Sequence, residues 1–428
     1  MHFDYMHPCD QIEILMARVY QYGMTTTSGG NLSVIDEKGD IWISPAGVDK
    51  GTLKAEDVVR VRASGEVNGR HAPSSEFPFH KAIYESRPGI GAILHAHPSA
   101  LVAFSVVGKV PDTTILPQAD HICGTAGFAP YAIPGSEALG KHIADTFEMG
   151  CDCVVLENHG VVCSGENLLD AYHRFETLDY CARVLLKSAT LGAHRTLSAE
   201  QIEMFHHGDN QLPAFEPEQR TNKEKKLRKF IRDIVHRAYD QHIMTSTSGV
   251  LSARLDDNSF LITPTGMDRK YIDEADIVLI REGRREAGRL PSLSVQLHQA
   301  IYQKHPDVKS IILAQAPNAM AFGVTESVLD TRTIPESYVV LRNVKKVPYG
   351  SQFGDGTQVA DTVSESCPVV LLENDAILAT GGSILQAFDR IEVAEFTARS
   401  LINALSIGEL APINDAQLRD LEDAFDLR

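Results

Sequence analysis

The sequence repeats itself at a spacing close to half of its 428 residues. Four short motifs of the first half return in the second half in the same order, at offsets of 220, 219, 218 and 216 residues. The matched segments are 25–29 with 245–249, 43–47 with 262–266, 80–84 with 298–302, and 155–158 with 371–374. Repetition in a near-constant register indicates duplication of one structural unit. We therefore predict two domains of the same fold, residues 1–210 and 211–428.

The predicted boundary lies in a polar stretch, residues 193–226. Apolar periodicity fades there into residues 206–210, two prolines and the charged run 223–226. Such a composition is typical of a linker. A new amphipathic helix is expected to begin near Lys226.

Helical and strand patterns alternate irregularly within each copy. In the first copy, apolar spacing predicts helices over residues 11–22, 76–86, 100–107 and 167–191. It predicts strands over residues 40–44, 58–61, 90–95, 153–156 and 161–163, with the last two forming a hairpin. We expect an α/β protein of two tandem domains, each with a mostly antiparallel central sheet flanked by helices.

The charge balance limits the partners. The chain carries 57 acidic and 40 basic side chains, a formal charge of −17. Nucleic acids and anionic membranes are bound through Lys/Arg-rich faces, so we expect neither as a partner. The N-terminal residues do not resemble a signal peptide, no apolar run is long enough to span a bilayer, and seven scattered cysteines do not predict a disulfide framework. We expect a cytoplasmic protein.

Three histidines are candidate metal ligands. His95 and His97 lie at the end of a predicted strand, where residues two apart point to the same face, and His159 lies in the predicted hairpin turn. Three neutral imidazoles with an open fourth position are typical of catalytic zinc. The alternative is that these are ordinary histidines.

Ser74, Ser75 and Glu76 open a predicted helix. The hydroxyls and the helix N-terminus could bind an oxyanion while Glu76 acts as acid or base, or the segment could simply cap the helix. Glycine-rich turns at residues 27–31, with Gly30, and 44–47 could present N–H groups to the same anion, although such turns are also common structural features.

The second copy serves as an internal control. Matching His80 to His298 places Ser294 opposite Glu76, and matching Pro98 to Pro317 places alanines opposite both His95 and His97. Asp375 stands opposite His159, and no counterpart of Asn31 remains. Because the same fold does without these residues, a chemical role in the first domain is favoured over packing or capping.

The ordered motifs at residues 28–31, 44–47, 74–76, 95–98 and 158–160 resemble the class II aldolase/adducin family. The resemblance covers the first copy and, in degenerate form, the second. It implies an α/β/α fold, one Zn²⁺ per chain on His95, His97 and His159, and Glu76 as acid/base. It also implies a phosphate site formed by Asn31, Gly47, Ser74 and Ser75. Ala46 stands where the family often has Thr, which favours a non-standard substrate.

The reaction implied by the resemblance is retro-aldol cleavage of a small phosphorylated ketose or keto acid, with zinc stabilising an enediolate. The related epimerases typically carry Asp at the position of Glu76, so Glu76 favours an aldolase. An epimerase, dehydratase or decarboxylase of the same family, and a non-catalytic adducin-like scaffold, remain as alternatives.

Family members are typically four-fold rings, and the aldolases borrow a tyrosine proton donor from a neighbour. The first copy has Asp120 in the relevant stretch, and counting from Pro117 and Pro335 places Tyr338 opposite it. We therefore expect a homodimer that forms a pseudo-four-fold ring, in which Tyr338 serves the site of the first copy. An ordinary buried tyrosine is the alternative.

Overall fold

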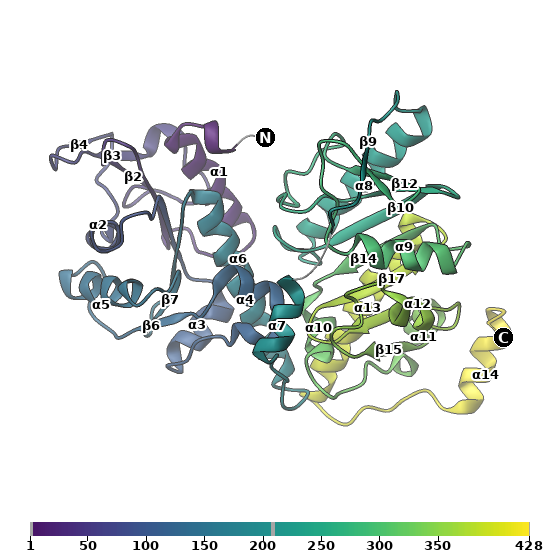
Figure 1. Cartoon of the computed structure of the whole chain (residues 1–428). Helices are drawn as coiled ribbons and strands as arrows, with labels where there is room; N and C mark the ends of the chain where they lie inside the picture. The colour runs from purple at the N-terminus through teal and green to yellow at the C-terminus, as the bar shows by residue number, and fades with distance from the viewer. Residues whose placement is uncertain (1–2, 207–209, 428) are drawn as a thin grey trace. The chain divides into compact units, whose positions relative to one another are not determined.

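The computed structural model describes residues 3–206 and 210–427 and contains two compact units (Figure 1). The first unit ends at Arg183 but leaves out Thr114–Gln118, which belong with Val184 and the residues after it to the second unit. The division predicted between residues 210 and 211 stays a prediction. Residues 207–209 of the predicted linker lie outside the described residues.

An eight-stranded sheet forms the centre of the first unit, in the order β4-β3-β2-β1-β5-β8-β7-β6. Its neighbouring strands are antiparallel except for β6 and β7, and β7 and β8 form the predicted hairpin. The strands are β1 Asn31–Ile35, β2 Ile41–Ile43, β3 Val59–Val61, β4 Val67–Asn68, β5 Ala92–Ala96, β6 Gly127–Ala129, β7 Cys153–Leu156 and β8 Val161–Gly165. The mostly antiparallel sheet is thereby confirmed.

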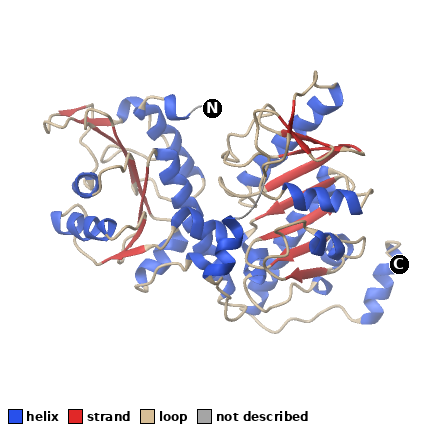
Figure 2. Ribbon diagram, viewed as in Figure 1, coloured by secondary structure: helices blue, strands red, loops and turns tan. Residues whose placement is uncertain are grey.

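Helices cover both faces of this sheet (Figure 2). One apolar cluster joins the sheet to α1, α3 and α6, and a second joins its other face to α2 and α5. The helices are α1 Pro8–Gln21, α2 Phe77–Ser86, α3 Ser99–Val106, α4 Pro117–Cys123, α5 Glu137–Glu148 and α6 Leu168–Ser188. Because successive residues of β5 alternate between the faces, Leu94 packs in the first cluster while Ile93 packs in the second.

The second unit repeats this order in a nine-stranded sheet, β15-β16-β17-β14-β10-β11-β12-β13-β9. The added strand β9 pairs parallel with β13 at one edge. The strands are β9 Ala214–Phe215, β10 Val250–Asp256, β11 Ser259–Ile262, β12 Val278–Arg281, β13 Arg284–Glu286, β14 Ser310–Ala314, β15 Val344–Val347, β16 Val369–Leu372 and β17 Ala376–Gly381. The helices are α7 Ala199–His206, α8 Asn222–Asp240, α9 Val295–Lys304, α10 Pro317–Gly323, α11 Pro335–Leu341, α12 Thr357–Thr362, α13 Ile384–Leu405 and α14 Asp415–Ala424.

Four short 3₁₀ helices complete the described structure, at Phe3–Tyr5, Ala55–Asp57, Thr113–Ile115 and Thr331–Thr333. Within residues 3–206 and 210–427, no helix is both long enough and apolar enough to cross a bilayer.

The helix expected near Lys226 begins earlier. The Thr221 side chain accepts a hydrogen bond from the backbone N–H of Glu224 at 3.2 Å, so α8 starts at Asn222. The charged run that suggested a linker therefore lies in the first turns of α8, and α7 occupies another part of the same stretch.

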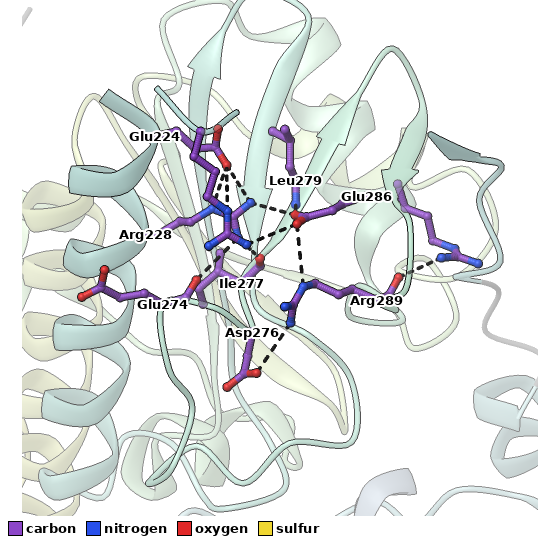
Figure 3. Close-up of polar contacts among 10 residues, drawn as sticks. Glu224, Arg228, Glu274, Asp276, Ile277, Leu279, Glu286 and Arg289 are labelled. Atoms are coloured by element: carbon purple, nitrogen blue, oxygen red, sulfur yellow. Dashed lines mark hydrogen bonds and ion pairs between the residues drawn. The ribbon is translucent and has the colours of Figure 1, made fainter. Parts of the chain in front are cut away.

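A buried ion cluster holds α8 against strands β12 and β13 (Figure 3). The Arg228 guanidinium is 1% exposed and donates to Glu224 and Glu286, at 2.7 to 2.8 Å, and to the carbonyl of Ile277. Glu286 also accepts from the backbone N–H of Leu279. Breaking such a buried pair by removing one partner typically costs about 3–5 kcal/mol, because the other charge is left uncompensated.

Candidate metal centre

His95, His97 and His159 converge in the first unit. One nitrogen from each ring lies within 4.8 Å of the others. The ring centroid of His95 is 4.7 Å from that of His97 and 4.9 Å from that of His159. Among residues 3–206 and 210–427, this is the only such group of histidine, cysteine and acidic side chains with metal-site spacing.

Backbone contacts direct the imidazoles toward one point. His95 Nδ1 lies 2.9 Å from the carbonyl oxygen of Val161 on β8. That contact fits a ring in which Nδ1–H donates to the carbonyl and Nε2 faces the centre. The backbone N–H of His159 donates to the Ser105 hydroxyl at 2.9 Å, which fixes the turn between β7 and β8.

Two glycines leave space for His97. A Cβ on Gly29 would lie 2.7 Å from His97 Nδ1, and a Cβ on Gly160 would lie 2.5 Å from His97 Cδ2. Both distances are shorter than non-bonded contacts allow, so these positions accept no side chain while His97 keeps its place.

Glu76 adjoins the three histidines at the start of α2, where its side chain is almost buried. One oxygen, Oε2, accepts from Asn31 Nδ2 at 2.7 Å and lies 3.2 Å from His95 Nε2. The other, Oε1, lies 3.3 Å from His159 Nε2. Burial opposes ionisation of Glu76, but the neighbouring His95, His159 and Asn31 outweigh it and lower the pKa of this carboxyl well below its usual range.

The donor set fits a divalent cation. Burial, followed by the neighbouring His95, lowers the pKa of His97 to about 3 and that of His159 to about 4, although the charge of Glu76 opposes both shifts. Both rings are therefore neutral near pH 7 and have nitrogen lone pairs to offer. Glu76 Oε1 is buried and has no hydrogen-bond partner in the described structure. Three imidazole nitrogens beside an unsatisfied carboxylate oxygen could hold one metal ion and leave a position for substrate.

A polar chain behind Glu76 sets its direction. Tyr84, Ser33 and His80 are buried and linked, with Ser33 Oγ 2.8 Å from the Tyr84 hydroxyl and 2.7 Å from His80 Nδ1. His80 Nε2 contacts Asn31 Oδ1, and Asn31 donates to Glu76. Burial lowers the pKa of His80 to about 3, so a neutral ring donating from Nε2 orients the Asn31 amide. The sequence did not reveal this series of hydrogen bonds, although His80 belongs to a repeated motif.

The predicted anion-binding residues lie around the same centre. Gly30 has a positive φ of 76°, and a Cβ there would lie 2.8 Å from the carbonyl oxygen of His95. The Ser74 hydroxyl accepts from the backbone N–H of Glu76 at 3.3 Å, and the backbone N–H of Ser74 donates to the Ser44 carbonyl. Ser75 is exposed. Gly47, with φ of 69°, ends the neighbouring turn.

Lys50 is a further charged residue here, and sequence reasoning missed it. Its side chain is 4% exposed, and its ammonium donates to the carbonyl of Pro45 at 2.8 Å. Its backbone N–H donates to Thr27, which joins the two glycine-rich turns. Burial lowers the pKa of Lys50, and the charge of Glu76 opposes that shift. Within the described residues, no carboxylate forms an ion pair with it at 4 Å or less.

A known family domain matches the chain twice. The model of the class II aldolase and adducin N-terminal domain matches residues 11–186 and again residues 230–402. The chain belongs to the class II aldolase and adducin family. The two matched segments show that the duplicated unit is this family's domain, in two tandem copies.

Curated relatives are similar over about two fifths of the chain. A 5-deoxy-D-ribulose 1-phosphate aldolase of Bacillus thuringiensis is 32% identical over 42% of this chain and 85% of its own length. An L-fuculose phosphate aldolase of Methanocaldococcus jannaschii is 34% identical, over 40% and 90%. A 3-oxo-tetronate 4-phosphate decarboxylase of Pectobacterium atrosepticum is also 34% identical, over 40% and 80%. The relatives of this class II aldolase family member thus include both aldolases and a decarboxylase.

Solved structures are similar over slightly less than half of the chain. An L-fuculose 1-phosphate aldolase is 30% identical and covers 46% of this chain and 92% of its own, with a TM-score of 0.42. YgbL of Escherichia coli, titled a putative aldolase/epimerase/decarboxylase, is 27% identical over 46% and 95%, with a TM-score of 0.43.

The second class II aldolase domain keeps the scaffold of the first but not its site. Ser252, His298 and Tyr302 repeat the buried chain, with Ser252 Oγ 2.6 Å from His298 Nδ1 and 2.7 Å from the Tyr302 hydroxyl. Val250 replaces Asn31, so His298 Nε2 has no hydrogen-bond partner in the described structure.

The strand registers correct the alignment of the two copies. Asn31 pairs with His95, and Val250 pairs with Leu313, so Leu313 rather than an alanine replaces His95. Gln315 then replaces His97, as Asp375 replaces His159. The proline match used to align the copies is one residue out of step, because α10 begins with its proline whereas Pro98 caps α3.

A second shift affects the glycine-rich turn. Lys50 N–H donates to Thr27 and Arg269 N–H donates to Ser246, which gives an offset of 219 residues and not 220. Ser248 therefore replaces Gly29, and Gly249 replaces Gly30.

Tyr338 lies on α11 of the second unit, and α4 holds the corresponding Asp120 in the first. The Tyr338 hydroxyl donates to Glu422 on α14 at 2.7 Å. This hydrogen bond, followed by burial, raises the pKa of Tyr338.

Proposed function

We propose that the first unit is a zinc-dependent lyase that cleaves a small phosphorylated ketose by retro-aldol chemistry. The carrying observation is the Glu76 carboxylate held within 3.3 Å of two of the three convergent histidines. The second unit, in which Ser294, Leu313, Gln315 and Asp375 occupy the matching positions, is proposed to be inactive. One metal ion per chain follows from this asymmetry.

In the proposed mechanism, His95, His97 and His159 hold the metal and Glu76 handles the proton. A divalent cation there would supply a Lewis acid for the negative charge that develops on the substrate's oxygens. Cleavage requires a proton to pass from the hydroxyl on one side of the breaking C–C bond to the ionised Glu76 carboxylate, and the electron pair of that bond to pass to the carbonyl side as an enediolate. Glu76, aimed by Asn31, then delivers a proton to the nucleophilic carbon of that fragment.

The anionic end of the substrate is proposed to bind at the two turns beside α2. Gly30 and Gly47 would offer backbone N–H groups, and Asn31, Ser74 and Ser75 would offer side-chain donors. These donors are all neutral. The buried ammonium of Lys50 would supply the positive charge, which matters in a chain of net charge −17.

Decarboxylation is a second candidate because a 34% identical relative is named a 3-oxo-tetronate 4-phosphate decarboxylase. Loss of CO₂ from a 3-oxo acid also leaves an electron pair beside a carbonyl, so the same metal and the same proton donor would serve. The two reactions differ in the group that leaves.

A substrate panel tests the proposal. Purified protein of known metal content is incubated with ketose 1-phosphates, with 3-oxo acid 4-phosphates and with their unphosphorylated forms, and released dihydroxyacetone phosphate, aldehyde or CO₂ is measured. Turnover of a ketose 1-phosphate that stops on chelation and returns with Zn²⁺ supports the aldolase. Release of CO₂ alone selects the decarboxylase, and no turnover with a full metal site contradicts both.

Replacing Lys50 by Met should weaken the binding of phosphorylated ligands by about 10- to 100-fold, since a hydrogen bond to a charged group is worth about 1.5–3 kcal/mol. Calorimetry with dihydroxyacetone phosphate and with unphosphorylated dihydroxyacetone measures the difference. Lys38→Met, at an exposed lysine of the same unit, is the control. An equal loss for both ligands would show that Lys50 only supports the fold.

We also propose that Tyr338 transfers a proton at the site of the first unit in a homodimer: it would relay the proton of the substrate hydroxyl in cleavage and donate a proton in the reverse aldol addition. Tyr338→Phe should then lower kcat by about 100-fold while the metal content and the oligomeric state stay unchanged. Tyr5→Phe, at an 89% exposed tyrosine, is the control. Full turnover by Tyr338→Phe in an unchanged assembly would exclude this role.

A further inference from the structure

In each copy of the repeat, a long helix (α6 or α13) is followed by an extended segment and a short helix. We call this extended segment together with its short helix an arm. The first arm is residues 189–206, from the end of α6 to the end of α7, and the second arm is residues 406–424, from the end of α13 to the end of α14. Their short helices, α7 and α14, begin at Ala199 and Asp415, an offset of 216 residues. The arms also share a sequence pattern, with residues 190–192 reading Thr-Leu-Gly and residues 406–408 reading Ser-Ile-Gly.

The two arms leave their folds by the same path. The backbone N–H of Leu197 donates to Thr114, and that of Ile413 donates to Arg332, at the same place in the repeat. Both short helices are also closed by a glutamine three residues after the cap: Gln201 accepts from the N–H of Ser198, and Gln417 accepts from the N–H of Asn414. The equivalence therefore extends to individual hydrogen bonds.

The first arm covers one face of the second unit. Arg195 N–H donates to Val324 at 2.8 Å, and His194 forms a β-bridge with Thr325. The Asn374 side chain donates to the carbonyl of Arg195, also at 2.8 Å. Further along the arm, Tyr349 donates to Gln201, Ser327 donates to Leu191, and Leu191 packs on the apolar core.

The matching face of the first unit is bare. Val106 and Val107 replace Val324 and Thr325; they are 56% and 62% exposed, whereas Val324 and Thr325 are fully buried. Tyr131, the counterpart of Tyr349, is 55% exposed. Asn158, the counterpart of Asn374, has the same positive φ and is exposed. The four exposed residues of this face are Val106, Val107, Tyr131 and Asn158. We call these four residues the bare face.

The second arm has an equally bare side. Ile407, the counterpart of the packed Leu191, is 89% exposed. Leu410, further along the second arm, is partly buried against the apolar core of its own unit, so the uncovered apolar residue of this arm is Ile407. The first unit thus exposes an apolar face, and the second arm an apolar side chain, at positions that are joined elsewhere in the same chain.

We propose that the second arm of one chain docks on the bare face of a second copy of this chain. Each copy has one such arm and one such face, so two copies can exchange arms reciprocally and close a dimer with two-fold symmetry. Leu410 would then bridge to Val107 as His194 does to Thr325. We call the contact between arm and bare face the joint. Ala411 of the second arm corresponds to Arg195 of the first, so the joint would be made by main-chain and apolar contacts, without the ion pair that Arg195 forms with Glu373.

Docking would also reach the three-histidine centre. Asn158 directly precedes His159, and the arm carbonyl that holds Asn374 in the second unit has its counterpart at Ala411. The partner copy would thereby brace the turn that carries His159. The docking itself rests on the repeat alone and not on the proposed function.

An engineered disulfide tests whether the arm that docks on the bare face belongs to the same chain or to a second chain. The β-bridge between His194 and Thr325 brings two backbones to the spacing that a disulfide needs, so Val107→Cys with Leu410→Cys should form a disulfide. We expect a two-chain species on a non-reducing gel from the double variant and none from either single variant. A disulfide within one chain, or no disulfide at all, would overturn the proposal.

Charge substitutions give an independent readout by sedimentation. Wild type should have the mass of two chains, and Val107→Glu or Ile407→Glu should weaken the dimer by at least about 100-fold, because each glutamate would be buried only in the joint. The thermal midpoint should be unchanged when it is measured at a dilution at which wild type and variants are all single chains, since association itself raises the midpoint of a dimer. Mixing the two variants should restore a two-chain species through the one intact joint. Met149→Glu, at a 74% exposed position of the first unit, is the control. A one-chain wild type, or dimers unaffected by either glutamate, would contradict the proposal.

Discussion

Replacing His97 by alanine should take the metal content from one ion per chain to none and abolish turnover, while the fold is retained. Its imidazole is one of three converging donors and is not part of either apolar cluster of the first unit. Loss of a supporting contact to a metal ligand already costs about 10- to 100-fold in affinity, so loss of the ligand should cost more. Elemental analysis after dialysis, beside circular dichroism and the substrate panel, measures each effect.

Gln315→Ala is the matched control, because Gln315 holds the position of His97 in the second unit. It should leave both metal and turnover unchanged. Two metal ions per wild-type chain, or metal retained by His97→Ala, would refute the asymmetric assignment.

Replacing Glu76 by glutamine should separate metal binding from catalysis. Glutamine keeps the shape of Glu76 and an oxygen for the Asn31 amide, so the histidine cluster should still bind metal. It cannot exchange the proton, and general acid–base catalysis contributes about 10²–10⁴-fold. We therefore expect kcat to fall by that factor, measured by single-turnover kinetics on metal-loaded protein.

Ser294→Ala, at the corresponding position of the second unit, should leave kcat unchanged. If Glu76→Gln kept turnover within about threefold of wild type, the proton would have to be handled by another group.

Much of the fold followed from local patterns. The repeat gave two copies of one domain, and the apolar alternation gave the strand that carries His95 and the hairpin that carries His159. Strand β1 was missed because it begins with Asn31 and has Ser33 at its centre, and buried polar residues break the apolar alternation. Their burial depends on hydrogen-bond partners 45 to 51 residues away, which no local window contains.

For the candidate site too, some residues could be predicted from the sequence and others could not. His95, His97, His159 and Glu76 were predicted as site residues because their side chains can ligate metals or transfer protons and the second copy lacks them, and the structure brings these four side chains together. Lys50 was missed because lysine is usually a surface residue, and only the fold buries it. The residue-by-residue match between the copies was wrong by one position in two places, because a shift of one residue is decided by the hydrogen-bond ladder and leaves the motifs recognisable.

The close approach of Gly29 to His97 has a consequence for the history of the second unit. Ser248 occupies that glycine position, and a Cβ there would collide with an imidazole placed as in the first unit. A single reversion of Gln315 to histidine would therefore meet a steric block before it could gain a ligand. The glycine would have to return first, although on its own it offers no new chemistry. A three-histidine cluster is thus hard to build in the second unit one substitution at a time, although that unit has the same scaffold.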